Sequence, residues 1–162
     1  MSTRVYIPST SGRLRELLVS GGLGPTPVHA HAVTREALVV LADADDEEQE
    51  YAVLTAAAQD SLGLLSAEER PRRVVVVAEA DTVLEADGEG SRVELHEVVP
   101  LRHVVAVHAD SEDAEEDVAA GRDAWPDAQA GDAAAQRTVD RCEQHELGWF
   151  ATQEMGGLVE PT

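Results

Sequence analysis

The sequence predicts an α+β fold with a mixed, largely antiparallel sheet of about five strands and helices packed mainly on one face. Segments rich in β-branched residues alternate with segments of helical periodicity along the whole chain. The strands predicted in the second half are separated by turns too short for a helical crossover, so they should pair antiparallel. The first two predicted strands are joined through a helix, and a three-layer α/β arrangement is the alternative.

The first half of the chain alternates predicted strands and helices. Residues 4–8 (RVYIP) are rich in strand-forming residues and end at a proline. The next segment, residues 12–20, carries leucines at helical spacing and ends at the Gly21-Gly22 pair. The elements that follow are a Gly/Pro loop at 23–27, a strand at 28–34, a short helix at 35–42, an acidic turn at 43–46 and a longer helix to about Leu65.

A run of four consecutive valines within Arg73–Ala78 is the strongest strand signal in the second half. Continuous β-branched residues indicate a strand covered on both faces, so this segment should lie centrally in the sheet. The remaining predicted elements are a turn at 87–90, strands at 92–99 and 103–109 separated by a turn at 100–102, an acidic helix at 112–120, a mobile loop at 121–131 and a last helix from about 132 to 155.

Length and composition predict one cytoplasmic domain spanning residues 1–162. A chain of this size buries roughly 70% of its unfolded surface and needs no disulfide or metal staple. Cys142 is the single cysteine, the start shows no secretory signal, and the longest apolar runs are far shorter than the ~20 residues of a membrane span. A protein that is neither secreted nor membrane-embedded is therefore expected.

The net charge of the chain limits the classes of molecule that it is expected to bind. Twelve basic residues, all arginine, and 32 acidic residues give a formal net charge of −20. Such a field repels nucleic acid and anionic membranes, both of which are bound through clustered cations. Another protein is therefore the expected partner. The absence of lysine and asparagine, whose codons are AT-rich, points to a GC-rich genome, either actinobacterial or haloarchaeal.

Established catalytic motifs are missing from the sequence. It contains no Walker-type phosphate loop, no G-x-G-x-x-G, no G-x-S-x-G, no paired C-x-x-C and no H-E-x-x-H. No cofactor and no defined metal site are therefore predicted.

The predicted last helix contains the clearest break in an apolar pattern. Val139, Cys142, Trp149 and Phe150 form one apolar face, and Glu146 falls in its middle. A carboxylate in an apolar stripe is costly unless it is paired or protonated. Glu146 is therefore a candidate catalytic group, unless it pairs with a buried arginine such as Arg4 or accepts backbone N–H bonds.

Further candidates surround this position. Glu143 and His145 are its neighbours on the last helix, and Glu47 and Glu50 lie beside the buried face of the long helix. If the two helices met over the sheet, these carboxylates and the histidine would converge as in di-metal sites, although the usual Glu-x-x-His pairs are absent. Solvated acids in the first helical turn are the alternative.

Two further groups are candidate binding residues. His108 and Asp110 share a strand face at a strand end, where clefts commonly form, although Asp110 could instead cap the following helix. Trp125 in the predicted loop and Trp149 are the aromatic candidates. His29 and His31 also share one strand face.

Three stretches resemble an actinobacterial family of small acidic proteins known only as a domain of unknown function. They are RVYIP at 4–8, EEQEYAVLTAAAQDSLGLL at 47–65 and HELGWFATQEM at 145–155. The resemblance favours the actinobacterial origin over the haloarchaeal one. It implies no substrate, cofactor or catalytic residue.

Two functions follow from these observations. The favoured hypothesis is a protein-binding regulator or adaptor without catalytic activity. The alternative is a metal-assisted hydrolase or related enzyme that uses the five helix-borne groups Glu47, Glu50, Glu143, His145 and Glu146.

Overall fold

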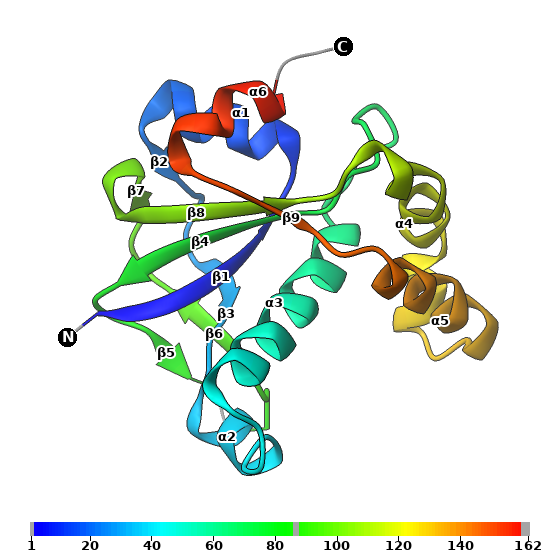
Figure 1. The fold of residues 1–162 in the computed structure, drawn as a ribbon, viewed down its shortest axis with the longest axis horizontal. Helices are drawn as coiled ribbons and strands as arrows, with labels where there is room; N and C mark the ends of the chain where they lie inside the picture. The colour runs from blue at the N-terminus through cyan, green and yellow to red at the C-terminus, as the bar shows by residue number, and fades with distance from the viewer. Residues whose placement is uncertain (1, 86–87, 160–162) are drawn as a thin grey trace.

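The computed structural model describes residues 2–85 and 88–159 and is organised around a seven-stranded sheet (Figure 1). The strand order is β5-β6-β3-β1-β4-β8-β9, and every pair in it is antiparallel. A short ladder of two further strands stands apart from it. The strands are β1 (Thr3–Ser9), β2 (Gly22–Leu23), β3 (Val28–His31), β4 (Val74–Ala80), β5 (Leu84–Glu85), β6 (Arg92–Leu95), β7 (Val99–Pro100), β8 (Val104–Ala109) and β9 (Gly148–Phe150).

The predicted α+β class and the antiparallel pairing are confirmed. The valine-rich strand β4 lies centrally, with β1 on one side and β8 on the other. The sheet has seven strands where about five were expected, because β5 and β9 are only two and three residues long. Segments this short carry no recognisable alternation in the sequence. The predicted strand at 92–99 is divided between β6 and β7, and the predicted turn at 87–90 lies partly outside the described residues.

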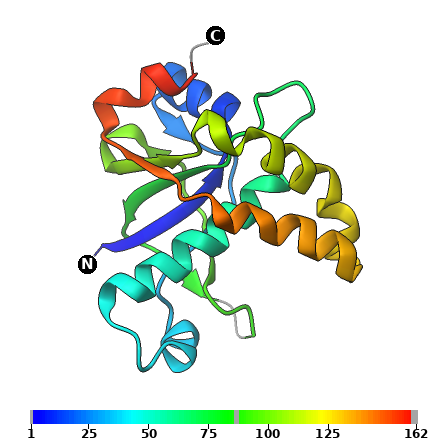
Figure 2. The same cartoon turned by 45° about the vertical axis from the view of Figure 1, so that its right-hand side comes forward.

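Two helices cover one side of the sheet, which we call the α1 side (Figure 2). Leu14 and Leu17 of α1 (Ser11–Ser20) and Met155 of α6 (Met155–Val159) pack on β1 and β4. Thr10 caps α1 by accepting a hydrogen bond from the Arg13 backbone N–H, and the helix ends at Gly21 with φ of 79°.

One long helix covers part of the opposite side, which we call the α3 side (Figure 1). Asp45 caps α3 (Asp46–Leu62), whose residues Val53, Ala57 and Ala58 pack against the sheet. The short helix α2 (Arg35–Val40) precedes it. Helices thus lie on both sides, and the predicted one-sided arrangement is corrected, because alternate valines of β4 face opposite ways and both sets need cover.

The predicted loop at 121–131 is wrong, because most of it belongs to α4 (Glu115–Gln129), which packs antiparallel on α5 (Ala133–Asp140) as a helical hairpin (Figure 2). Gly121 and Pro126 suggested a loop. In the structure a Cβ at Gly121 would lie 2.9 Å from Cys142 Sγ, so this glycine permits close packing. The 3₁₀ turn at Glu112–Ala114 replaces the start of the predicted acidic helix.

The predicted single helix from 132 to 155 is also wrong. After α5 the chain forms a 3₁₀ turn at Arg141–Gln144, the strand β9, a second 3₁₀ turn at Thr152–Glu154 and then α6. Pairing of Phe150 with Val107 of β8 draws this segment into the sheet. Glu146 therefore precedes an edge strand and is exposed, and no apolar helix face surrounds it. Within the described chain, no helix has the length and apolar character required to cross a membrane.

Candidate functional site

A groove runs between α3 and the β8–β9 edge of the sheet, and we call it the α3 groove. It consists of two cavities of about 470 and 340 Å³ that share Tyr51, Leu54 and His108 in their walls. The groove exists because α3 packs closely on β1 and β4 but leaves the outer strands on this side uncovered.

The larger cavity combines aromatic rings and carboxylates. Trp149 of β9 is 61% exposed and Tyr51 of α3 is 53% exposed. Tyr6 of β1 is buried and donates a hydrogen bond to Glu50. Burial, assisted by the negative charge of Glu50, raises the pKa of Tyr6 to about 12, so its hydroxyl remains protonated at neutral pH. Glu47 is a further carboxylate in the wall.

The smaller cavity is bounded by the segment that leads into β9. Glu143 and Glu146 are both exposed here, and Glu143 accepts a hydrogen bond of 2.7 Å from the Gln59 side chain of α3. His145 Nε2 lies 2.8 Å from Asp117 Oδ2 of α4, and the imidazole N–H donates because a carboxylate only accepts. The histidine thereby links this cavity to the helical hairpin.

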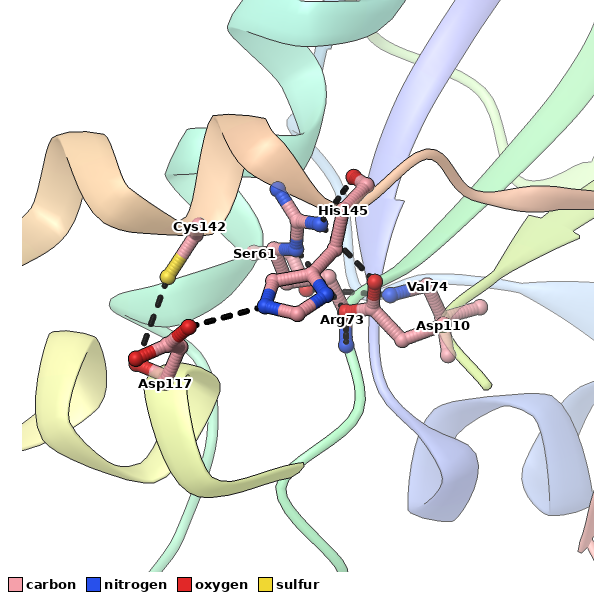
Figure 3. Close-up of polar contacts among 7 residues, drawn as sticks. All are labelled: Ser61, Arg73, Val74, Asp110, Asp117, Cys142 and His145. Atoms are coloured by element: carbon pink, nitrogen blue, oxygen red, sulfur yellow. Dashed lines mark hydrogen bonds and ion pairs between the residues drawn. The ribbon is translucent and has the colours of Figure 1, made fainter. Parts of the chain in front are cut away.

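A buried ion pair lies beneath the smaller cavity (Figure 3). Arg73 donates from Nε and Nη2 to the two oxygens of Asp110, each at 2.8 Å, and the same carboxylate accepts the Arg73 backbone N–H. Arg73 also donates to the backbone carbonyl of His145 at 3.0 Å. The side chains are 2% and 0% exposed, so Asp110 neither caps the following helix nor faces a ligand.

A thiol and an imidazole complete this region. Cys142 donates from Sγ to the backbone carbonyl of Asp117 at 3.4 Å, and burial raises the pKa of its thiol to about 11 (Figure 3). His108 lies between the two cavities, and burial lowers its pKa. Its Nδ1 atom is buried, with no hydrogen-bond partner in the described part of the chain. The neutral imidazole of His108 therefore lies between the carboxylates of the larger cavity and those of the smaller cavity.

The structure brings most of the predicted site residues into the α3 groove, although not to one point. The larger cavity holds Glu47, Glu50, His108 and Trp149, and the smaller holds Glu143, His145, Glu146 and His108 again. Among residues 2–85 and 88–159, no group of three or more His, Cys, Asp or Glu side chains is arranged to hold a metal ion. Trp125 lies elsewhere, half-buried against Gly63, where a Cβ would approach its Nε1 atom closely.

One polar cluster was not predicted from the sequence. Asp60, Ser91 and Arg92 surround His31, which had been noted only for sharing a strand face with His29. The contacting residues are 29 and 60 positions away from His31 along the chain. Residues so far apart in the chain form no local sequence motif. The shared strand face of His29 and His31 was therefore the sole indication in the sequence of polar residues on this side of the sheet.

The fold and its groove together define an acidic α+β protein with aromatic side chains beside a carboxylate-rich cleft. The chain belongs to a family of unknown function, DUF6912, which it matches over residues 3–159. The predicted resemblance to a domain of unknown function is thereby confirmed, and the actinobacterial origin stays a prediction. No curated protein and no solved structure shows significant similarity to it.

Proposed function

We propose that the protein binds a basic segment of another protein in the α3 groove and acts through this contact as a regulator or adaptor. The observation that carries the proposal is the pair of exposed aromatic rings, Trp149 and Tyr51, on the walls of an acidic groove. Tryptophan and tyrosine are enriched among the residues that dominate binding energy at protein interfaces. Large exposed aromatic groups in a concave surface favour a ligand with apolar side chains.

The charges of the groove favour a basic ligand. Four carboxylates line it, and the two arginines that also contribute are already paired with other acids. Arg4 lies 3.1 Å from Glu79, and Arg73 is committed to Asp110. The groove therefore keeps an excess of negative charge, which the net charge of −20 reinforces at longer range. Complementary charge accelerates association and excludes acidic competitors. The four carboxylates are Glu47, Glu50, Glu143 and Glu146.

Fluorescence anisotropy with short labelled peptides tests the proposal. Peptides that combine arginine or lysine with leucine and aromatic residues should bind, whereas matched peptides with glutamate in place of the basic residues should not. Trp149→Ala should weaken binding by about 30-fold, as loss of an interface hot spot of about 2 kcal/mol implies. Val40→Ala is the matched control, because Val40 is 82% exposed and lies outside the groove.

Removal of single charges separates specific binding from general attraction. The double variant Glu47→Gln/Glu50→Gln should reduce both the affinity for basic peptides and its dependence on salt. Glu68→Gln removes an exposed charge outside the groove and should change neither. Equal affinity of basic and acidic peptides, or unchanged affinity after Trp149→Ala, would contradict the proposal.

The metal-assisted alternative has a separate test. The carboxylates it requires are spread along the groove, and among the described residues they form no group able to hold a metal ion. Elemental analysis of protein purified without a metal-affinity tag should find no stoichiometric transition metal if the groove serves binding. One metal ion per chain, lost in Glu50→Gln or Glu143→Gln, would instead favour the hydrolase.

A further inference from the structure

A second site lies on the α3 side of the sheet, near the edge opposite to β9. A cavity of about 470 Å³ is bounded by β3, β5, β6 and the last turns of α3. Among the described residues, none lines both this cavity and the α3 groove. His31 stands at its wall, is 3% exposed and has a polar partner on each ring nitrogen.

The hydrogen bonds of His31 form a directed chain. Its Nε2 atom lies 2.6 Å from Asp60 Oδ2, and its Nδ1 atom lies 2.7 Å from Ser91 Oγ. A carboxylate only accepts, so Nε2 carries the hydrogen, and Nδ1 of the neutral ring is left with a lone pair. The Ser91 hydroxyl therefore donates its hydrogen to Nδ1. A serine whose proton points at a base, with an acid orienting that base, is the arrangement of an activated nucleophile.

The surrounding backbone holds Ser91 in this position. Gly90 precedes it with φ of 62°, a conformation that side-chain-bearing residues rarely adopt. The Gly90 carbonyl accepts from Thr34 Oγ1 at 2.7 Å, and the Ser91 carbonyl accepts from the Ala32 backbone N–H at 2.9 Å. The turn is thus tied to the end of β3, the strand that carries the base. Ser91 itself remains partly exposed.

We propose that Ser91 is a catalytic nucleophile, activated by His31 and Asp60, that cleaves small uncharged or cationic carboxylic esters. The adjoining cavity, which is lined by His31, Asp60 and Arg92, the residue next to Ser91, has a volume in the range of small-molecule sites. Leu84 supplies apolar wall for an acyl or alkyl group, and Glu85 and Glu89 disfavour an anionic substrate. Compared with the familiar serine triads, the two ring nitrogens of His31 have exchanged roles. Either nitrogen can act as the base when the other donates its hydrogen to an acid.

The reaction balances without a cofactor. Ser91 Oγ attacks the ester carbonyl carbon while its proton passes to His31 Nδ1, and the resulting imidazolium is stabilised by Asp60. His31 then returns that proton to the departing alkoxide, which leaves as an alcohol. A water molecule next gives a proton to His31 while its hydroxide adds to the acyl carbon. The bond between that carbon and Ser91 Oγ then breaks, and His31 returns the proton to Oγ, which releases the carboxylic acid and restores Ser91. Arg92, whose guanidinium lies 3.2 Å from Asp60 Oδ1 and is about half exposed, is the nearby cation for the carbonyl oxygen.

Labelling of the full chain with a fluorophosphonate probe tests the nucleophile directly. Mass spectrometry after proteolysis should locate one adduct on Ser91, and p-nitrophenyl butyrate should release p-nitrophenolate with a burst. The wild-type protein gives this result without relying on the folding of any variant.

Variants then assign the roles. Ser91→Ala should abolish both the adduct and esterase activity, and Asp60→Asn should slow labelling by at least about tenfold, as expected for loss of the orienting acid. Ser111→Ala removes an exposed serine outside the cavity and should match the wild type. Absence of labelling in the folded wild-type protein would overturn the proposal. Adducts spread over several serines would overturn it equally.

Discussion

The two sides of the sheet differ in what they bury. On the α1 side the central strands present mainly aliphatic side chains, such as Val5, Ile7 and Val76, and two helices cover them. On the α3 side the same strands present Tyr6, and Arg73 and His31 stand nearby, under one helix that leaves cavities on both flanks. Burial of polar groups is costly unless they are bonded, so each of these three groups has a partner.

This contrast separates stability from chemistry. An apolar surface covered by helices supplies folding free energy but offers few polar groups for a ligand to recognise. A partly covered surface with fixed polar groups loses some of that free energy and gains directed hydrogen bonds at accessible cavities. Both proposed sites therefore lie on the α3 side.

The largest expected effect comes from breaking the buried ion pair. Asp110→Ala should lower the free energy of unfolding by about 3–5 kcal/mol, because it leaves the Arg73 guanidinium buried without its carboxylate. Urea denaturation measures the loss. Glu79→Gln, which removes the partner of the more exposed Arg4, should cost less than about 1 kcal/mol. Equal losses of unfolding free energy in the two variants would show that the buried ion pair stabilises the fold no more than the exposed one.

A matched pair of leucines compares the two sides directly. Leu17→Ala on the α1 side removes a fully buried side chain and should cost about 2–5 kcal/mol. Leu54→Ala on the α3 side should cost clearly less, since Leu54 is only partly buried and borders the groove. If Leu54→Ala were as costly as Leu17→Ala, the α3 side would be packed as tightly as the other.

Alkaline pH should destabilise the α3 side through Tyr6. Its folded pKa, about 12, lies above the ordinary value of 10, so the folded state keeps a proton that the unfolded chain loses. Stability from this group is complete below pH 10 and is lost as the pH rises to about 12. The difference is on the order of 2 kcal/mol. Tyr6→Phe should therefore show a shallower decline in urea midpoint over this range, and parallel declines would contradict the assignment.

Screening by salt should give the smallest change. At −20 the chain repels itself, and acids are concentrated in the first turns of α3 and α4. The melting temperature should rise by a few degrees between low salt and several hundred millimolar sodium chloride, as the Debye length falls below ~10 Å. A flat or falling trend in a thermal melt followed by circular dichroism would show that local ion pairs already compensate the charge.

The parts of the fold that the sequence predicted are those specified locally. The valine run marked a central strand, Gly21 ended α1, and short connections implied antiparallel pairing. The errors arose where a distant contact overrides a local signal. Gly121 suggests a loop until its approach to Cys142 is known, and Trp149 and Phe150 suggest a helix face until β8 is placed beside them.

The candidate site followed the same rule. Glu47, Glu50 and His108 were identified because residue type and spacing were enough to select them, and the structure places them in one cavity. The Ser91–His31–Asp60 chain was not predicted, because its members come from a turn, a strand and a helix far apart in sequence. Only tertiary pairing of β3 with β6 brings the serine to the histidine.

The position of β1 in the strand order has a consequence for biosynthesis. Among the strands of the described sheet, β1 is synthesised before the others, yet it lies between β3 and β4, and its long partner β4 begins some seventy residues later, at Val74. A nascent chain therefore carries an apolar central strand with one edge unpaired until β4 emerges. Folding of the sheet must close long-range contacts, which is slow. During synthesis, the unpaired edge of β1 is the surface on which we expect a chaperone to act.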